Sequence, residues 1–380
     1  MKTVDIDQAM DGQQASELHN LRWVQPNDPG FLLAGFAFGG SENGFFRFPQ
    51  AANNLLQAVN PALVMLSSHT SGGQLFFCTN SSELCIRVKL RAVASICHMS
   101  TTGECGFDAY AMEDDGRYHF FNAVKYDATR QQYSYCFFSG RDRIPQNFLF
   151  HFPLYCGVES LEIGLDADAQ LYEPPQFAMQ GRVVLYGTSI TQGGCASRPG
   201  MSYPNLLSRM LGIEMINFGF SGNGNGEPEI AQLVASVPNV RLLILDYEAN
   251  AGPNGTLEQT FDGFIDIFRE HYPTTPILVL GTIPMPMPLH SPATTQELSA
   301  HKAFMQRSIS QRNLHGDSQI AFMSGEALLG EDWWECTVDG THPTDLGFYR
   351  MAAALAKPVQ ALLLQTKNAS FQAPTCNHNF

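Results

Sequence analysis

The stretch "VLYGTSITQGG" (Val184–Gly194) joins a run of apolar residues to a serine, Ser189, and a pair of glycines. The apolar run is typical of a strand that is buried on both faces of a sheet. Two interpretations of the hydroxyl residues are open. Either Thr188 or Ser189 caps the helix that follows, or Ser189 is a nucleophile. The sequence patterns on either side of this stretch predict the fold in which it lies.

Downstream of this stretch, apolar strand patterns alternate with amphipathic helix patterns. The predicted strands are 182–187, 214–219, 240–247, 275–283 and 318–324. The predicted helices are 202–211, 227–237, 256–272, 294–313 and 344–365. This alternation predicts a three-layer α/β domain around a five-stranded, mostly parallel sheet. In such sheets, functional sites form at the carboxyl ends of the strands.

The chain upstream has a different pattern, with short runs of aromatic and β-branched residues separated by turn signals. These runs lie at 75–80, 83–90, 118–126, 133–140, 147–154 and 158–165. Their spacing predicts an antiparallel, jelly-roll-like β-sandwich, with residues 50–60 as a candidate helix. The predicted organisation is a β-sandwich domain over 1–172, a linker over 173–182, the α/β domain over 183–366 and a tail over 367–380.

Composition narrows the classes of partner. Of the 380 residues, 44% are hydrophobic and 15% are charged, which predicts a packed protein. The formal net charge of −14 argues against a nucleic-acid partner, because an acidic surface repels phosphates. No apolar run approaches the ~20 residues of a membrane span, so no membrane partner is expected.

The cysteines and the N-terminal sequence indicate the cellular compartment, and the cysteine spacing also tests for a metal site. The N-terminal sequence has no signal-peptide pattern, and the nine cysteines include no C-x-x-C pair, so we expect a cytoplasmic protein with reduced thiols. Cys97, His98 and Cys105 do not have the spacing of a common zinc site. We therefore expect neither a metal nor a cofactor.

Polar residues gather where the predicted strands of the α/β domain end. Ser189 follows the first strand, Gly222 lies in the glycine-rich loop after the second, and Asn250 follows the third. Asp339 and His342 precede the last helix, three residues apart, a spacing that lets the carboxylate reach Nδ1 of the ring. Taken alone, each is more simply a cap, a turn residue or a structural histidine. Together they supply the nucleophile, oxyanion donors, base and orienting acid of acyl transfer.

The blocks that carry these residues resemble the SGNH (GDSL-type) hydrolase superfamily, with "GTSIT" (187–191) in place of the usual Gly-Asp-Ser. "INFGFSGNGNGEPEIA" (216–231) and "DGTHPTDLGF" (339–348) are similar to the branch with an extra N-terminal β-domain. That branch resembles carbohydrate acetyl esterases and GDSL-type acyltransferases.

The resemblance implies a role for each residue. Ser189, Asp339 and His342 match the catalytic triad. The backbone N–H groups of Ser189 and Gly222, with the side-chain amide of Asn250, match the oxyanion hole. Thr188 stands where relatives often have an acidic residue, but that position is not the triad acid.

We therefore expect a serine esterase that removes a small acyl group, acetyl first, from a hydroxyl of a sugar or related compound, with a small-molecule or oligosaccharide ester as its substrate. An O-acyltransferase with the same triad and a non-catalytic carbohydrate-binding protein are the alternatives. Arg198, Trp333 and Trp334 are candidates for lining the substrate pocket. A salt bridge for Arg198 and a buried aromatic pair for the two tryptophans are the other interpretations. The oligomeric state stays open, because a strand edge of the β-half could pair between chains.

Overall fold

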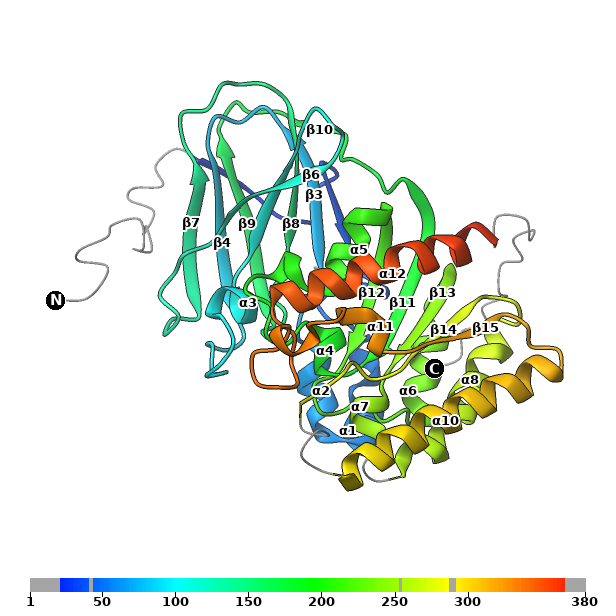
Figure 1. Cartoon of the computed structure of the whole chain (residues 1–380). Coiled ribbons are helices and arrows are strands. Elements are labelled where there is room, and N and C mark those ends of the chain that lie inside the picture. Colours follow the sequence, from blue (N-terminus) through cyan, green and yellow to red (C-terminus); the bar gives the residue numbers. More distant parts are fainter. Residues whose placement is uncertain (1–20, 41–43, 253–254, 287–291, 366–380) are drawn as a thin grey trace.

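The computed structural model describes residues 21–40, 44–252, 255–286 and 292–365 (Figure 1). Its antiparallel β-domain and its α/β domain with five parallel strands confirm the predicted fold class. Within the described residues, no helix combines the length and the apolar character needed to cross a bilayer. The predicted domain boundaries stay predictions, and the predicted tail at 367–380 lies outside the described residues.

The β-domain contains two antiparallel sheets. The first has the strand order β1-β9-β4-β7, and the second has the order β10-β3-β8-β5-β6 with β2 paired to β3. Their strands are β1 (Leu21–Val24), β2 (Phe31–Ala34), β3 (Gln74–Thr79), β4 (Leu84–Leu90), β5 (Asp108–Met112), β6 (Tyr118–Ala123), β7 (Gln132–Phe138), β8 (Gln146–His151), β9 (Val158–Asp166) and β10 (Leu171–Tyr172). All six runs predicted from the sequence are strands of these sheets.

The core of the β-domain lies between the two sheets. Ile86 and Val88 of β4 are buried in one cluster with Phe148 and Phe150 of β8, because alternate residues of a strand point to the same face. Cys85 of β4 lies opposite Cys136 of β7, and the structure joins the two by a disulfide. The expectation that all cysteines are reduced is therefore wrong for this pair.

The α/β domain is built on one parallel sheet with the strand order β12-β11-β13-β14-β15. Its strands are β11 (Met179–Gly187), β12 (Ile213–Gly219), β13 (Val240–Asp246), β14 (Ile277–Leu280) and β15 (Ile320–Met323). Each corresponds to one of the five predicted strands. Because β11 lies between β12 and β13, the loops that leave these three strands are neighbours at the carboxyl edge of the sheet.

Helices cover both faces of this sheet (Figure 1). One face packs against α5 (Tyr203–Leu211) and α12 (Asp345–Gln365). The other packs against α6 (Pro228–Ala235), α8 (Thr256–His271) and α10 (Pro292–Leu314). Shorter helices lie in the loops: α4 (Ser189–Gln192), η4 (Pro199–Met201), α7 (Glu248–Ala251), α11 (Glu326–Leu329) and η5 (Trp333–Glu335).

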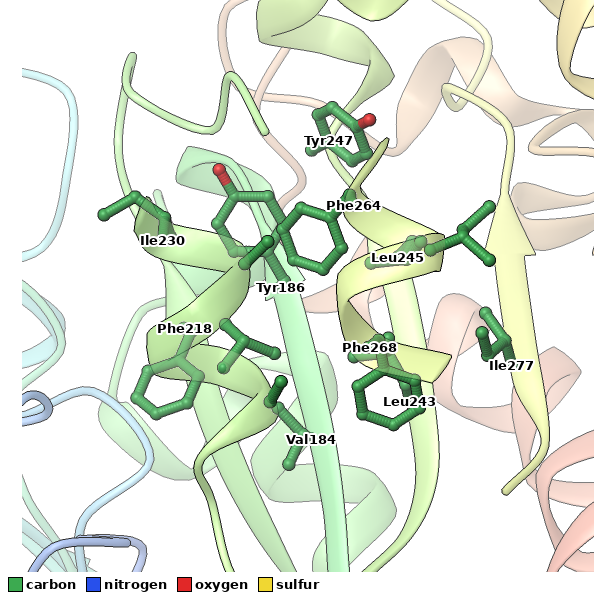
Figure 2. Close-up of a cluster of buried hydrophobic side chains, with 14 of the residues drawn as sticks. Val184, Tyr186, Phe218, Ile230, Leu243, Leu245, Tyr247, Phe264, Phe268 and Ile277 are labelled. Atoms are coloured by element: carbon green, nitrogen blue, oxygen red, sulfur yellow. The ribbon is translucent and has the colours of Figure 1, made fainter. Parts of the chain in front are cut away.

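Strand β11 shows why its sequence is apolar without alternation. Val183 and Leu185 are buried against the α5 and α12 side, whereas Val184 and Tyr186 are buried against the α6 and α8 side. Figure 2 shows Val184 and Tyr186 in that second layer, with the ring of Tyr186 stacked beside Phe264 of α8. Burying an aliphatic or aromatic side chain of this size contributes roughly 1.5–3 kcal/mol, so both faces of the strand stabilise the fold.

Part of the N-terminal half completes the core of the α/β domain. It consists of η3 (Gln50–Ala52), α1 (Asn53–Val59) and α2 (Pro61–Ser67). Leu56 and Leu63 of these helices are fully buried in the same cluster as Phe218 of β12. Arg47 just before them is also buried, and its guanidinium donates hydrogen bonds to the backbone carbonyls of Asn217 and Leu66.

A buried ionic network joins the two domains. Asp108 of β5 accepts hydrogen bonds from Arg198 Nη1 and Gly200 N, both at 2.8 Å, and from His151 Nδ1 at 2.9 Å. His151 Nε2 lies 3.0 Å from Arg209 Nη1, a group that can only donate. His151 is therefore neutral, and burial lowers its pKa to about 4.

Candidate active site

The first half of the site is the turn from β11 into α4. Thr188 is the N-cap of α4, and its Oγ1 accepts a hydrogen bond from the backbone N–H of Ile190 at 3.3 Å. The capping interpretation of this stretch therefore applies to Thr188. Ser189 is the first residue of α4 and is 8% exposed. Its own backbone N–H lies in the first turn, where N–H groups have no partner within the helix.

Two glycines let α4 lie directly on the strand ends. A Cβ at Gly219 would lie 2.2 Å from the backbone nitrogen of Gln192. A Cβ at Gly187 would lie 2.0 Å from Thr191 Oγ1 and 2.6 Å from the carbonyl oxygen of Asp246. Any larger residue at either position would push α4, and Ser189 with it, away from the sheet.

The second half of the site is the loop between η5 and α12. His342 Nε2 lies 2.9 Å from Ser189 Oγ, and His342 Nδ1 lies 2.7 Å from Asp339 Oδ2. Asp339 Oδ1 accepts hydrogen bonds from the backbone N–H groups of Thr341 and His342, at 2.9 and 2.7 Å. The structure thus brings Ser189 together with Asp339 and His342, which follow it in the sequence by 150 and 153 positions.

The charge of Asp339 fixes the tautomer of His342. Burial by itself raises the pKa of Asp339, but hydrogen bonds from the backbone and ring of His342 and from the backbone of Thr341 lower it to about 2. A carboxylate can only accept, so Nδ1 of His342 carries the proton that faces it. Nε2 is then left without a proton and can accept one from the Ser189 hydroxyl.

The loops that follow β12 and β13 carry the candidate oxyanion-hole residues Gly222 and Asn250. Asn250 lies in α7, and its Oδ1 accepts a hydrogen bond from Gly224 N at 3.1 Å. This bond leaves the Nδ2 end of the amide as the donor. Gly222 is exposed two residues earlier, in a left-handed conformation with φ 67°. The residue of this loop that binds Asn250 is therefore Gly224, while Gly222 lies at the exposed turn.

A buried glutamine supports the same loop. Gln192 Oε1 accepts a hydrogen bond from Ser221 N at 3.0 Å, next to Gly222. Gln192 Nε2 lies 3.0 Å from both His69 Nδ1 and the carbonyl oxygen of Leu154. Because Nε2 donates, His69 Nδ1 accepts, and burial followed by the charge of Arg47 lowers the pKa of His69 to about 3. Sequence reasoning missed Gln192 and His69.

Two residues of the β-domain reach the site and were also missed. Tyr155 donates a hydrogen bond from its hydroxyl to the backbone carbonyl of Ser189, at 3.1 Å. His98 Nε2 lies 3.3 Å from Asp339 Oδ2, and the rings of His98 and His342 are 6.0 Å apart. Neither contact has a local sequence signal, because each depends on how the two domains pack.

The three candidate pocket residues have different surroundings. Arg198 lies in the buried ionic network, where it binds Asp108 and stacks 3.8 Å from the ring of Phe120. Its guanidinium thus has the salt-bridge role that was the alternative interpretation. Trp333 packs partly into the core beneath α12, whereas Trp334 is 59% exposed. The role of these residues in substrate binding stays a prediction.

Family comparisons match both halves of the chain. Residues 180–360 match the GDSL-like lipase/acylhydrolase family, and residues 21–171 match the N-terminus of SGNH-hydrolase-type esterases. No curated protein matches the chain.

Solved structures match along most of the chain. A Bacteroides ovatus protein classed as a GDSL-like lipase is 27% identical, with a TM-score of 0.81, over 91% of this chain and 98% of its own. A salicylyl-acyltransferase from a tetracycline biosynthetic pathway is 19% identical, with a TM-score of 0.75, over 90% of this chain and 98% of its own. A family two carbohydrate esterase from Clostridium thermocellum, in complex with cellohexaose, is 16% identical, with a TM-score of 0.53. The match covers 78% of this chain and 94% of its own.

Proposed function

The chain belongs to the SGNH (GDSL-type) hydrolases, and on this premise we propose that it is a serine esterase for small acyl esters, acetyl esters first, of a sugar or sugar-like compound. The observation that carries the proposal is the line of contacts from Ser189 Oγ to His342 Nε2, 2.9 Å, and from His342 Nδ1 to Asp339 Oδ2, 2.7 Å. These are the contacts that a serine nucleophile, its base and an orienting acid require.

The reaction has two halves. Ser189 Oγ attacks the ester carbonyl while His342 Nε2 takes the hydroxyl proton, and the charge of Asp339 stabilises the imidazolium that forms. His342 then gives this proton to the oxygen of the leaving alcohol, and an acyl-serine remains. Water attacks the acyl-serine with His342 again as the base, which releases the carboxylic acid and restores Ser189.

Each tetrahedral intermediate places a negative charge on the carbonyl oxygen. We assign its stabilisation to the backbone N–H groups of Ser189 and Gly222 and to Nδ2 of Asn250. The bond from Gly224 to Oδ1 of Asn250 orients the amide before the substrate arrives. Donors that are already oriented need no reorganisation when the charge develops.

Two observations support a carbohydrate as the carrier of the ester. The exposed ring of Trp334 belongs to the segment that leads into the Asp339–His342 loop, and an exposed indole can pack against a sugar ring. The fold is also shared with a family two carbohydrate esterase that binds cellohexaose. A small acyl group agrees with a nucleophile that is only 8% exposed.

The test compares wild type with Ser189→Ala on p-nitrophenyl acetate, butyrate and octanoate, and on acetylated xylo-oligosaccharides. We expect acetate to be hydrolysed fastest, and Ser189→Ala to lower kcat by about a thousandfold or more. Ser310→Ala, which removes an exposed hydroxyl on α10, is the matched control and should retain full activity. Hydrolysis that survives in Ser189→Ala would exclude Ser189 as the nucleophile.

Acyl transfer is the second candidate, because the fold of a salicylyl-acyltransferase matches 90% of this chain. In that case an alcohol replaces water in the second half of the reaction. Adding cellobiose to the p-nitrophenyl acetate assay distinguishes the two. Release of acetic acid at the rate of p-nitrophenol supports the esterase, whereas acetylated cellobiose as the main product supports the transferase.

A further inference from the structure

Side chains of the types that bind transition metals lie close together at the His342 and Asp339 end of the candidate triad. His98, Cys195 and His342 each offer one ligand atom, and these atoms lie within 4.8 Å of one another. Asp339 Oδ2 lies 3.3 Å from His98 Nε2 and 2.7 Å from His342 Nδ1. Two imidazoles and a thiol thus lie together at the boundary of the two domains, and the Asp339 carboxylate contacts both imidazoles.

We propose that His98, Cys195 and His342 form an inhibitory Zn²⁺ site, and that the neighbouring Asp339 carboxylate turns in as the fourth ligand. Zn²⁺ binds imidazole, thiolate and carboxylate ligands in a tetrahedral arrangement, with bonds of about 2.0–2.3 Å. Ligand atoms around such an ion are roughly 3.3–3.8 Å apart, so the ligand atoms of His98, Cys195 and His342 need to close by about 1 Å. Asp339 Oδ2, 2.7 Å from His342 Nδ1, needs to move outward by a similar amount. The exposed ring of His98 and the half-buried side chain of Cys195 can make this movement by rotation.

The backbone that carries His98 is fixed. Glu104, which is 3% exposed, accepts hydrogen bonds from Ser95 N at 2.7 Å and from Ile96 N at 3.1 Å. On the other side of His98, Met99 is 5% exposed and packs into the core around α5 and α12. The ring of His98 is therefore presented to Asp339 by an ordered segment that is anchored at both ends.

The backbone that carries Cys195 is fixed as well. Cys195 has φ 84°, a left-handed conformation that is uncommon for a residue with a side chain. The next residue, Ala196, is fully buried, and a Cβ at Gly103 of α3 (Thr101–Cys105) would lie only 2.0 Å from its carbonyl oxygen. This close packing holds the backbones that carry the ligands of the two domains at a constant spacing, while the side chains remain free to rotate.

Zinc at this place would stop the proposed reaction, and this part of the inference rests on the proposed function. When Zn²⁺ bonds to His342 Nδ1, the proton on Nδ1 moves to Nε2, and the thiol of Cys195 releases its proton to solvent. A ring with a proton on Nε2 cannot accept the proton of Ser189, so the nucleophile is not activated. A chelator that removes Zn²⁺ restores the original tautomer and the activity.

Binding is tested without reference to activity. Cd²⁺, which takes the same ligands, is titrated into the protein while thiolate-to-metal charge-transfer absorbance is recorded in the ultraviolet. We expect wild type and Ser189→Ala to bind one equivalent with this band, and Cys195→Ser to lose it. Cys97→Ser is the matched control, because Cys97 Sγ lies 3.6 Å from Nδ1 of His98, the nitrogen that faces away from Asp339. A band that persists in Cys195→Ser overturns the proposal.

Inhibition is tested on p-nitrophenyl acetate, without thiol reductants. Zn²⁺ should inhibit wild type and Cys97→Ser alike, EDTA should reverse the effect, and Cys195→Ser should need about tenfold more Zn²⁺ or more. Equal inhibition of wild type and Cys195→Ser would show that zinc acts elsewhere and overturn the proposal. A protein that binds one Cd²⁺ through Cys195 but lacks esterase activity would retain the metal site and refute only the proposed function.

Discussion

Asn250 uses the two ends of one amide for different tasks. Its Oδ1 holds Gly224 N at 3.1 Å, and its Nδ2 is the donor that we assign to the oxyanion hole. Asn250→Asp keeps the acceptor and loses the donor, so we expect kcat for p-nitrophenyl acetate to fall by about 100- to 1000-fold with little change in Tm. A decrease in kcat of less than threefold would remove Asn250 from the oxyanion hole.

His69 makes stability depend on pH through a single imidazole. The pKa of His69 is about 3 in the folded protein, against an ordinary value of 6.5 in the unfolded chain. Between these two pH values the imidazole therefore carries a proton in the unfolded chain but not in the folded protein. The contribution of His69 to stability is complete above pH 6.5 and is lost as pH falls toward 3. We expect the unfolding free energy of His69→Gln to fall less steeply with acidification, by up to about 1.4 kcal/mol per pH unit. Urea unfolding at several pH values measures both slopes, and parallel slopes would contradict the prediction.

Helix α4 depends on the absence of side chains beneath it. Gly219→Ala would place a Cβ 2.2 Å from a backbone nitrogen, which cannot rotate away. We expect a loss of roughly 2–4 kcal/mol in urea unfolding, with a lower kcat because Ser189 moves with α4. The matched control is Gly263→Ala on the exposed side of α8, where a Cβ meets nothing within 4 Å. This control should stabilise the protein by about 0.5–1 kcal/mol, because alanine favours the helix. Equal stability of the two variants would contradict the packing argument.

The elements that sequence patterns predicted are those whose apolar or aromatic runs recur at a regular spacing along the chain. The five parallel strands and the six longer β-runs belong to this group. Strands β1, β2 and β10 have only two to four residues and stand outside such a series, whereas the four-residue strands β14 and β15 alternate with helices. Strand β5 (Asp108–Met112) has the sequence DAYAM, which lacks β-branched residues, and it is a strand because it pairs with β6 and β8.

The residues of the candidate site also fall into those that could be predicted from the sequence and those that could not. Ser189, Asn250, Asp339 and His342 could be predicted, because a parallel sheet brings the ends of its strands to one edge whatever the loops contain. The β-domain contribution of His98 could not, because no local pattern shows how two domains pack. The disulfide between β4 and β7 was missed for a similar reason, since it depends on the register of two strands.

At the scale of the whole molecule, Asp108 is the anion on which the interface of the domains depends. Asp108→Asn removes the negative charge that faces Arg198 and accepts from the neutral His151 ring, and leaves the Arg198 guanidinium without its counter-charge. We expect the unfolding free energy to fall by about 3–5 kcal/mol. Asp168→Asn is the control: Asp168 also binds an arginine, Arg143, but its side chain is 73% exposed, so the loss should be at most about 1 kcal/mol. Similar losses for both variants in urea unfolding would show that burial of the network does not matter.

The packing of α1 and α2 against β12 has a consequence for biosynthesis. Leu56 and Leu63 leave the ribosome long before Phe218, the strand residue with which they share a core. At a translation rate of about 5–20 residues per second, these helices wait roughly 8–30 s for their partner. During that time the nascent chain carries an uncovered apolar face. We therefore expect the core of the α/β domain to close only after β12 has been synthesised, and chaperones that bind nascent chains to cover this face until then.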